Sequence, residues 1–145
     1  DLSCPGNINN PKGYVILVEN PKLENGEVYS GKALLMVPEN SINGYIQGIY
    51  PEYTIQNGDH FRVIVNCDYQ ASGCNALLRV DYQISNGTIF TLWQFSEAYE
   101  GKYYSANVDL SPLAGNTVRF ILSVFSEGSA ENDKVIWAGP RIERP

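Results

Sequence analysis

The chain of 145 residues is long enough for a domain that buries roughly 70% of its unfolded surface. Its formal net charge of −6 argues against nucleic-acid binding, because a phosphate backbone requires a basic surface. No apolar run reaches the roughly 18 residues that span a bilayer, and no signal segment opens the chain. Since the sequence begins with Asp1 rather than Met, we interpret it as a mature or trimmed fragment.

Short apolar runs punctuated by 13 Gly and 8 Pro predict an all-β protein. The segment 109–115 (DLSPLAG) predicts a single helical turn that Asp109 or Ser111 caps. The regular turn signals favour an antiparallel β-sandwich, with residues 1–12 as an irregular arm and 13–145 as one domain. In chain order, the expected strands cover residues 13–18, 33–37, 44–50, 53–56, 60–68, 75–85, 88–96, 102–108, 117–125 and 134–138.

Three cysteines are an odd number, and two of them lie close together in the sequence. Cys67 and Cys74 are near enough for a local disulfide, which indicates an oxidising compartment outside the cytoplasm. The alternative is three reduced thiols in a cytosolic protein. Cys4 is left over, either with a partner upstream of this fragment or as a spare thiol.

The two cysteines also suggest a strand pairing. If they face each other across a hairpin neck, strands 60–68 and 75–85 pair, and Arg62 lies opposite Arg79. The bridge would then fix the register, because a slip of one residue exchanges the two faces of a strand. One face of this pair is uniformly apolar and consists of Phe61, Val63, Val65, Ala76, Leu78 and Val80.

A second hairpin is predicted at Asn86-Gly87, since both residues tolerate the positive φ of a type I′ turn. With Ser85 opposite Thr88, Trp93 joins the apolar face and points inward. The resulting pairs are Leu78 with Phe95, Arg79 with Gln94, Val80 with Trp93, Asp81 with Leu92, Tyr82 with Thr91 and Gln83 with Phe90.

The opposite face of these strands carries planar polar side chains and one aromatic ring. Arg, Asp and Gln make paired hydrogen bonds to vicinal hydroxyls, and an aromatic ring stacks on an apolar sugar face. This mixture favours a glycan ligand; the alternatives are a solvated face, in which Asp81 neutralises the arginines, and a protein–protein contact. The candidate glycan-binding residues are Arg62, Arg79, Asp81, Gln83, Phe90 and Gln94.

Signals for catalysis are poor. His60 is the only histidine, and there is no nucleophile elbow, phosphate-binding loop or matched pair of acids for glycoside hydrolysis. We therefore expect no enzyme activity. The oxygen-rich segments 19–27 and 129–133 contain the ligand types that calcium prefers, although solvated turns have the same composition.

Three segments resemble jelly-roll carbohydrate-binding modules of bacterial xylanases and mannanases and related galactose-binding-like domains: VENPKLENGEVYSGKALLMV, VDLSPLAGNTVRFILSV and NDKVIWAGPRI. The whole chain also resembles uncharacterised domains of large secreted bacterial proteins, in which a GC…C segment precedes the DYQI strand. The resemblance implies a non-catalytic glycan-binding jelly roll in which Glu24 is a ligand of a structural calcium ion. The chain departs from these modules at Ala138-Gly139, where they often carry acidic residues.

These observations together predict a secreted, non-catalytic module that binds polysaccharide on a polar sheet face, with no cofactor or one structural calcium ion. The binding would be weak per site and strengthened when several modules act on one polymer. The alternative function is a structural or adhesive extracellular domain, in a larger secreted protein or surface assembly, that self-associates or pairs through Cys4.

Overall fold

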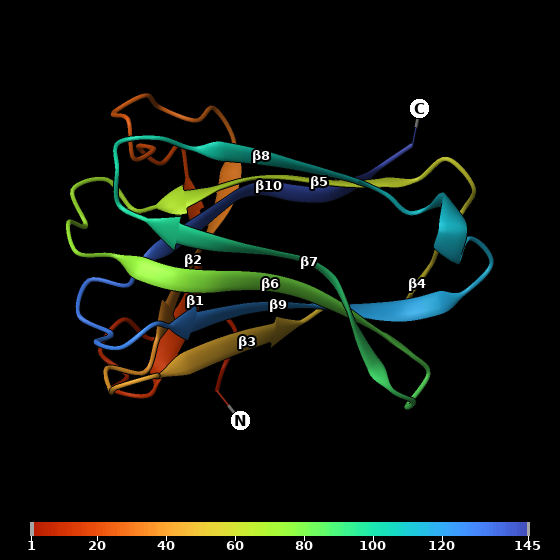
Figure 1. Ribbon diagram of the computed structural model, residues 1–145, viewed down its shortest axis with the longest axis horizontal. Helices are drawn as coiled ribbons and strands as arrows, with labels where there is room; N and C mark the ends of the chain where they lie inside the picture. The colour runs from red at the N-terminus through yellow and green to blue at the C-terminus, as the bar shows by residue number, and fades with distance from the viewer. Residues whose placement is uncertain (1, 145) are drawn as a thin grey trace.

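The computed structural model describes residues 2–144, which form a sandwich of two antiparallel sheets (Figure 1). One sheet, here the β5 sheet, has the strand order β1-β2-β10-β5-β8. The other, here the β6 sheet, has the order β3-β9-β6-β7, with β4 also paired to β9. The strands are β1 (Gly13–Glu19), β2 (Lys32–Pro38), β3 (Tyr45–Ile49), β4 (Tyr53–Thr54), β5 (His60–Cys67), β6 (Asn75–Ile84), β7 (Ile89–Ala98), β8 (Tyr104–Asp109), β9 (Thr117–Ser126) and β10 (Val135–Glu143).

This architecture confirms the predicted all-β jelly-roll sandwich. Each expected strand is present, and most boundaries agree within two residues. The last strand is an exception, because β10 continues five residues beyond the predicted end at Ala138. The predicted helical turn is the 3-10 helix η1 (Ser111–Leu113), where the Ser111 N–H donates to Oδ1 of Asp109 at 2.9 Å.

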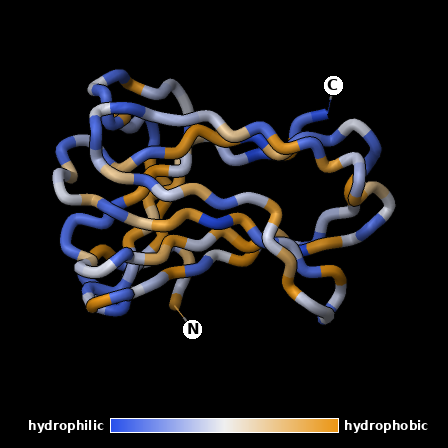
Figure 2. Tube along the Cα trace, viewed as in Figure 1, coloured by the Kyte–Doolittle hydropathy of each residue, from blue (hydrophilic) through white to orange (hydrophobic). Residues whose placement is uncertain are grey.

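The core lies between the two sheets, and apolar and polar residues alternate along the strands that enclose it (Figure 2). Trp137 of β10 is fully buried at its centre. Trp93 of β7 is half-buried, packs edge-on against Trp137 at 6.5 Å and stacks on Phe95 at 6.0 Å. The prediction that Trp93 points inward is confirmed.

The disulfide between Cys67 and Cys74 is present, but the predicted pairing of β5 with β6 is wrong. Cys67 ends β5 and Cys74 immediately precedes β6, so the bridge joins the two sheets instead of closing a hairpin neck. The sequence could not separate these arrangements, since alternation places the same residues inward in both. The predicted apolar face is buried in full, from both sheets: Phe61, Val63, Val65, Ala76, Leu78 and Val80.

The β6–β7 hairpin is present, with an irregularity that the sequence did not predict. Predicted pairs are correct from Leu78 to Val80, and the register then shifts, so that Asp81 pairs with Thr91. The turn differs from the prediction as well. Positive φ occurs at Ser85 instead of Asn86 and Gly87, and the Gly87 N–H donates to the Ile84 carbonyl at 3.0 Å.

Candidate functional site

Four of the six predicted glycan-binding residues share the outer face of the β6 sheet. Arg79, Asp81 and Gln83 alternate along β6 with core residues, and Gln94 of β7 is the strand partner of Arg79. A transverse row crosses four strands here, because Gln47 pairs with Ser123 and Ser123 pairs with Arg79. We call this surface the β6 outer face; its central residues are Tyr45, Gln47, Arg79, Asp81, Gln94, Ser123 and Phe125.

Arg62 does not belong to this face. It lies on β5 in the other sheet, where it pairs with Asn107 and Arg141 on the neighbouring strands. Its Nη1 contacts Oε1 of Glu143 at 3.4 Å, and both side chains are about two-fifths exposed. The prediction that Arg62 faces Arg79 was therefore wrong, for the same reason as the β5–β6 pairing.

Phe90 also leaves the predicted face. The register shift after Val80 makes Phe90 the partner of Tyr82, on which its ring stacks at 5.5 Å. Tyr82 packs against the core side of the sheet, whereas Asp81 and Gln83 point to the other side. One extra residue in β7 thus moved the predicted stacking ring to the opposite face.

Asp81 organises the polar part of the β6 outer face. Its side chain is 3% exposed, and Arg79 Nε donates to its Oδ2 at 2.9 Å. The Thr91 hydroxyl donates to Oδ1, also at 2.9 Å. Both carboxylate oxygens are therefore hydrogen-bonded, and the arginine is held in one orientation by a charge-assisted bond.

Aromatic side chains that were not among the six predicted binding residues lie beside this pair. Tyr45 is 59% exposed on the edge strand β3 and stacks on Phe125 of β9, with 6.0 Å between ring centroids. The guanidinium carbon of Arg79 lies 4.6 Å from the centroid of the Phe125 ring. The alternation of Tyr45, Gln47 and Ile49 predicts a strand face, but no sequence signal connects that strand to Arg79.

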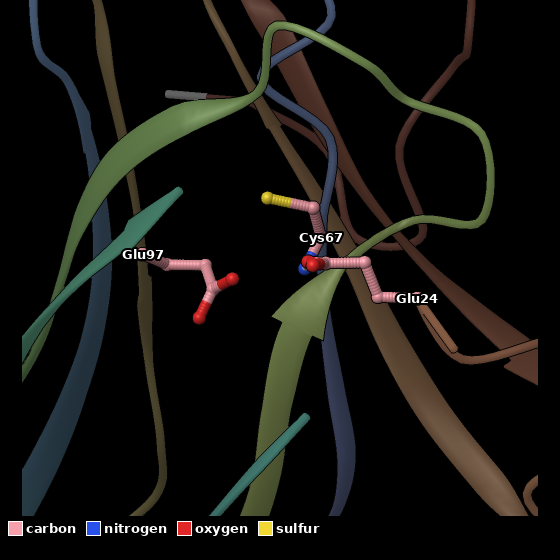
Figure 3. Close-up of side chains that lie close together, drawn as sticks. All are labelled: Glu24, Cys67 and Glu97. Atoms are coloured by element: carbon pink, nitrogen blue, oxygen red, sulfur yellow. The ribbon is translucent and has the colours of Figure 1, made fainter. Parts of the chain in front are cut away.

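The residue implied as a calcium ligand, Glu24, is buried in a cluster with Cys67 and Glu97 (Figure 3). One carboxylate oxygen of Glu24, one of Glu97 and the Cys67 sulfur all lie within 4.8 Å of one another. Oε1 of Glu24 accepts the Cys67 N–H at 2.9 Å. Its Oε2 accepts the N–H groups of Glu100, Gly101 and Lys102 at 2.7, 2.8 and 3.2 Å.

These contacts fit a calcium ion poorly. Four N–H donors already surround the Glu24 carboxylate, and the Cys67 sulfur is part of a disulfide. On β10, Ala138 is fully buried, and a side chain at Gly139 would collide with the Tyr29 hydroxyl. Neither Ala138 nor Gly139 supplies a carboxylate oxygen where the resembling modules often have one.

Glu97 is the unusual member of the cluster. It is 1% exposed, and among residues 2–144 neither of its carboxylate oxygens has a hydrogen-bond partner. Burial raises the pKa of Glu97 to about 9, and the nearby Glu24 and Glu100 contribute to the rise. The group is therefore protonated and uncharged at neutral pH.

A second perturbed carboxyl group lies at the other end of β5. The Tyr53 hydroxyl donates to Oδ2 of Asp59 at 2.6 Å, and Arg144 Nε donates to Oδ1 at 3.0 Å. The Tyr53 bond, with further bonds from the Gln56 N–H and Arg144, lowers the pKa of Asp59 to about 2 against the opposing effect of burial. Through its bond to Arg144, Asp59 holds the C-terminal segment of the chain in place. Asp59 directly precedes β5, which lies in the other sheet from the β6 outer face.

Comparisons with solved structures identify the fold. The module TmCBM61, in complex with β-1,4-galactotriose, is similar at a TM-score of 0.60 and 10% identity, over 90% of this chain and 82% of that one. CBM51 from Clostridium perfringens GH95, in complex with methyl-galactose, is similar at 0.53 and 19%, over 99% and 85%. The CBM22-1-GH10 modules of Clostridium thermocellum xylanase 10B, complexed with xylohexaose, match at 0.53 and 17%, over 93% of this chain and 25% of that one.

The chain therefore has a jelly-roll β-sandwich fold similar to that of these carbohydrate-binding modules. No protein-family model matches the chain, and no curated protein matches it in sequence. Within residues 2–144, no helix has the length and apolarity required to cross a membrane.

Proposed function

We propose that the protein is a non-catalytic carbohydrate-binding module of a secreted protein and that it binds polysaccharide on the β6 outer face. Arg79, Gln83 and Gln94 would hydrogen-bond to sugar hydroxyls, the buried Asp81 would hold the Arg79 guanidinium in place, and Tyr45 would stack on a sugar ring. The observation that carries the proposal is the ordered Arg79–Asp81 pair beside an exposed, stacked tyrosine.

The chemistry of this face suits a sugar. A pyranose presents hydroxyls at its edge and a patch of C–H groups on its faces, and it is recognised by planar polar groups next to an aromatic ring. Arg79 retains N–H donors beyond the Nε that binds Asp81, and Gln94 lies beside it on the next strand. Similar folds bound to galactotriose, methyl-galactose and xylohexaose support a saccharide as the ligand class.

The proposal assigns no step to a metal ion. Because the Glu24 carboxylate already accepts four backbone hydrogen bonds, we infer that it anchors residues 100–102 directly. Secretion is part of the proposal, and the Cys67–Cys74 disulfide supports it, since such bonds persist in oxidising compartments.

A structural or adhesive role is the second candidate. It is favoured by the free, exposed thiol of Cys4 and by exposed apolar side chains on and before β3, namely Ile42 and Ile49. An adhesive domain would self-associate or form a disulfide-linked dimer, whereas a glycan module would remain monomeric. Light scattering with and without reductant separates the two roles.

Affinity electrophoresis against soluble plant, fungal and bacterial polysaccharides tests the glycan proposal. We expect at least one polymer to retard the wild type and the Arg79→Ala, Asp81→Ala double variant to lose that retardation. Tyr45→Ala is the complementary variant, because an exposed side chain can be removed without disturbing the core. The matched control is Arg62→Ala, Glu143→Ala, which removes an exposed ion pair from the other sheet. Absence of retardation on every polymer would refute the proposal.

A further inference from the structure

A pocket of about 330 Å³ opens between the sheets, away from the β6 outer face. Its lining includes the segment 50–52, which joins β3 to β4, and residues 140–142 near the end of β10. Its walls are mostly aromatic and aliphatic, and its only charged lining residues are Glu52 and Arg141. The apolar lining consists of Tyr50, Pro51, Tyr53, Phe61, Phe120, Leu122, Pro140 and Ile142.

The strand pairing explains why this edge of the sandwich is open. β2 pairs with β10 only as far as Ala138, and the register of β10 on β5 shifts between Ala138 and Arg141. Pro140 lies in that irregular stretch and has no N–H for a neighbouring strand. On the opposite sheet, the edge along β9 is interrupted between β3, which ends at Ile49, and β4, which begins at Tyr53.

The walls of the pocket are held in place by contacts between the lining residues and by a hydrogen bond to a residue outside the lining. Phe61 and Phe120 face each other from the two sheets, with 6.4 Å between ring centroids and 28° between ring planes. The Tyr53 hydroxyl is bonded to the buried Asp59, which fixes the ring. A pocket whose rings are already ordered binds without the entropic penalty of ordering them.

Arg141 offers a hydrogen-bond donor at the rim of the pocket. The Glu52 carboxylate is paired with Arg119 at 3.3 Å. Arg141 uses Nε on Glu143 at 2.9 Å and Nη1 on the Gly139 carbonyl at 3.0 Å. Among residues 2–144 its Nη2 has no hydrogen-bond partner, so this nitrogen can donate to a ligand oxygen at the rim.

We propose that this pocket binds a planar aromatic acyl group, with the ring against the aromatic walls and the carbonyl oxygen on Arg141. A sugar without such an acyl group would place most of its hydroxyls against apolar side chains, where they would have no hydrogen-bond partners. Burying hydroxyls without partners is unfavourable. An aromatic ring, in contrast, makes favourable contacts with neighbouring aromatic rings. The volume agrees, since an apolar cavity of about 150 Å³ holds a benzene molecule and this pocket leaves room for the acyl chain.

The inference goes beyond the proposed function and does not depend on it, because the two sites share no residue. Its test is an NMR titration of the wild type with methyl 4-hydroxycinnamate. We expect saturable shifts at the amides of Tyr50, Phe120 and Ile142. Arg141→Gln should weaken binding about tenfold, as expected for loss of one charge-assisted hydrogen bond.

The matched control is Arg62→Gln, because Arg62 also contacts Glu143 but does not line the pocket. It should bind the ester as the wild type does. Tyr50→Ala, at a residue 37% exposed, should also weaken binding, because it removes one aromatic ring from the lining and leaves Arg141 unchanged. No shifts up to the solubility limit, shifts confined to the β6 outer face, or equal losses in both arginine variants would overturn the inference. None of these outcomes bears on retardation by polysaccharide.

Discussion

Replacing Glu97 with Gln should stabilise the protein at neutral and alkaline pH. Glu97 is 1% exposed and has a pKa of about 9, against an ordinary value of 4.5. Above pH 4.5 the unfolded chain loses this proton while the folded state keeps it, so stability falls as pH rises and levels off above about pH 9. At pH 7 the interval from 4.5 spans about 2.5 pH units, which at roughly 1.4 kcal/mol each amounts to about 3 kcal/mol. Glutamine has a neutral side chain of the same shape, so this substitution removes the pH dependence that Glu97 gives to the stability.

The assay is urea unfolding of the wild type and Glu97→Gln at pH 5, 7 and 9. We expect the difference in the free energy of unfolding to be small at pH 5, about 3 kcal/mol in favour of the variant at pH 7, and larger at pH 9. Glu27→Gln, at an exposed residue, controls for the loss of a carboxyl group. A difference that stays the same at all three pH values would refute the reasoning, as would a variant that is less stable than the wild type at pH 9.

Three further predictions concern the other buried contacts. Replacing Cys67 and Cys74 with Ser should lower the free energy of unfolding by about 2–3 kcal/mol, the value for so short a loop, measured by denaturant titration. Glu24→Gln should destabilise by at least about 3 kcal/mol, because it weakens four hydrogen bonds to a charged acceptor, whereas EDTA and added calcium should leave the wild-type melting temperature unchanged. Asp59→Asn should remove stability that the wild type has above pH 4 and loses as pH falls toward 2, seen as a flatter acid-unfolding curve.

The sequence predicted the strands well because alternation and turn residues are local signals. Nine of the ten expected ranges agree with the structure within two residues, and so do the inward residues of β5 and β6. Which strands are neighbours is not a local property. Cys67 and Cys74 have Cα atoms 6.2 Å apart, a spacing as compatible with a bridge between sheets as with a hairpin neck. The wrong choice placed Arg62 next to Arg79.

The sequence predicted only the part of the candidate site that depends on local signals. Arg79, Asp81 and Gln94 share a face because they lie on one hairpin, whose register is correct up to Val80. The shift that follows has no sequence signature, since it depends on how β7 accommodates an extra residue, and it removed Phe90. Tyr45 was missed because it reaches Arg79 only through β9, which no pattern links to β3.

The central claim is that polysaccharide binds on the β6 outer face, and mapping the contact residues tests it most directly. An oligosaccharide cut from a polymer that retards the protein would be titrated into isotope-labelled wild type, with backbone amide shifts recorded by NMR. The account predicts that the largest shifts occur on β3, β6, β7 and β9, in the rows that contain Tyr45, Arg79 and Gln94. Shifts concentrated on the β5 sheet, or in the loops at the ends of the sandwich, would contradict it.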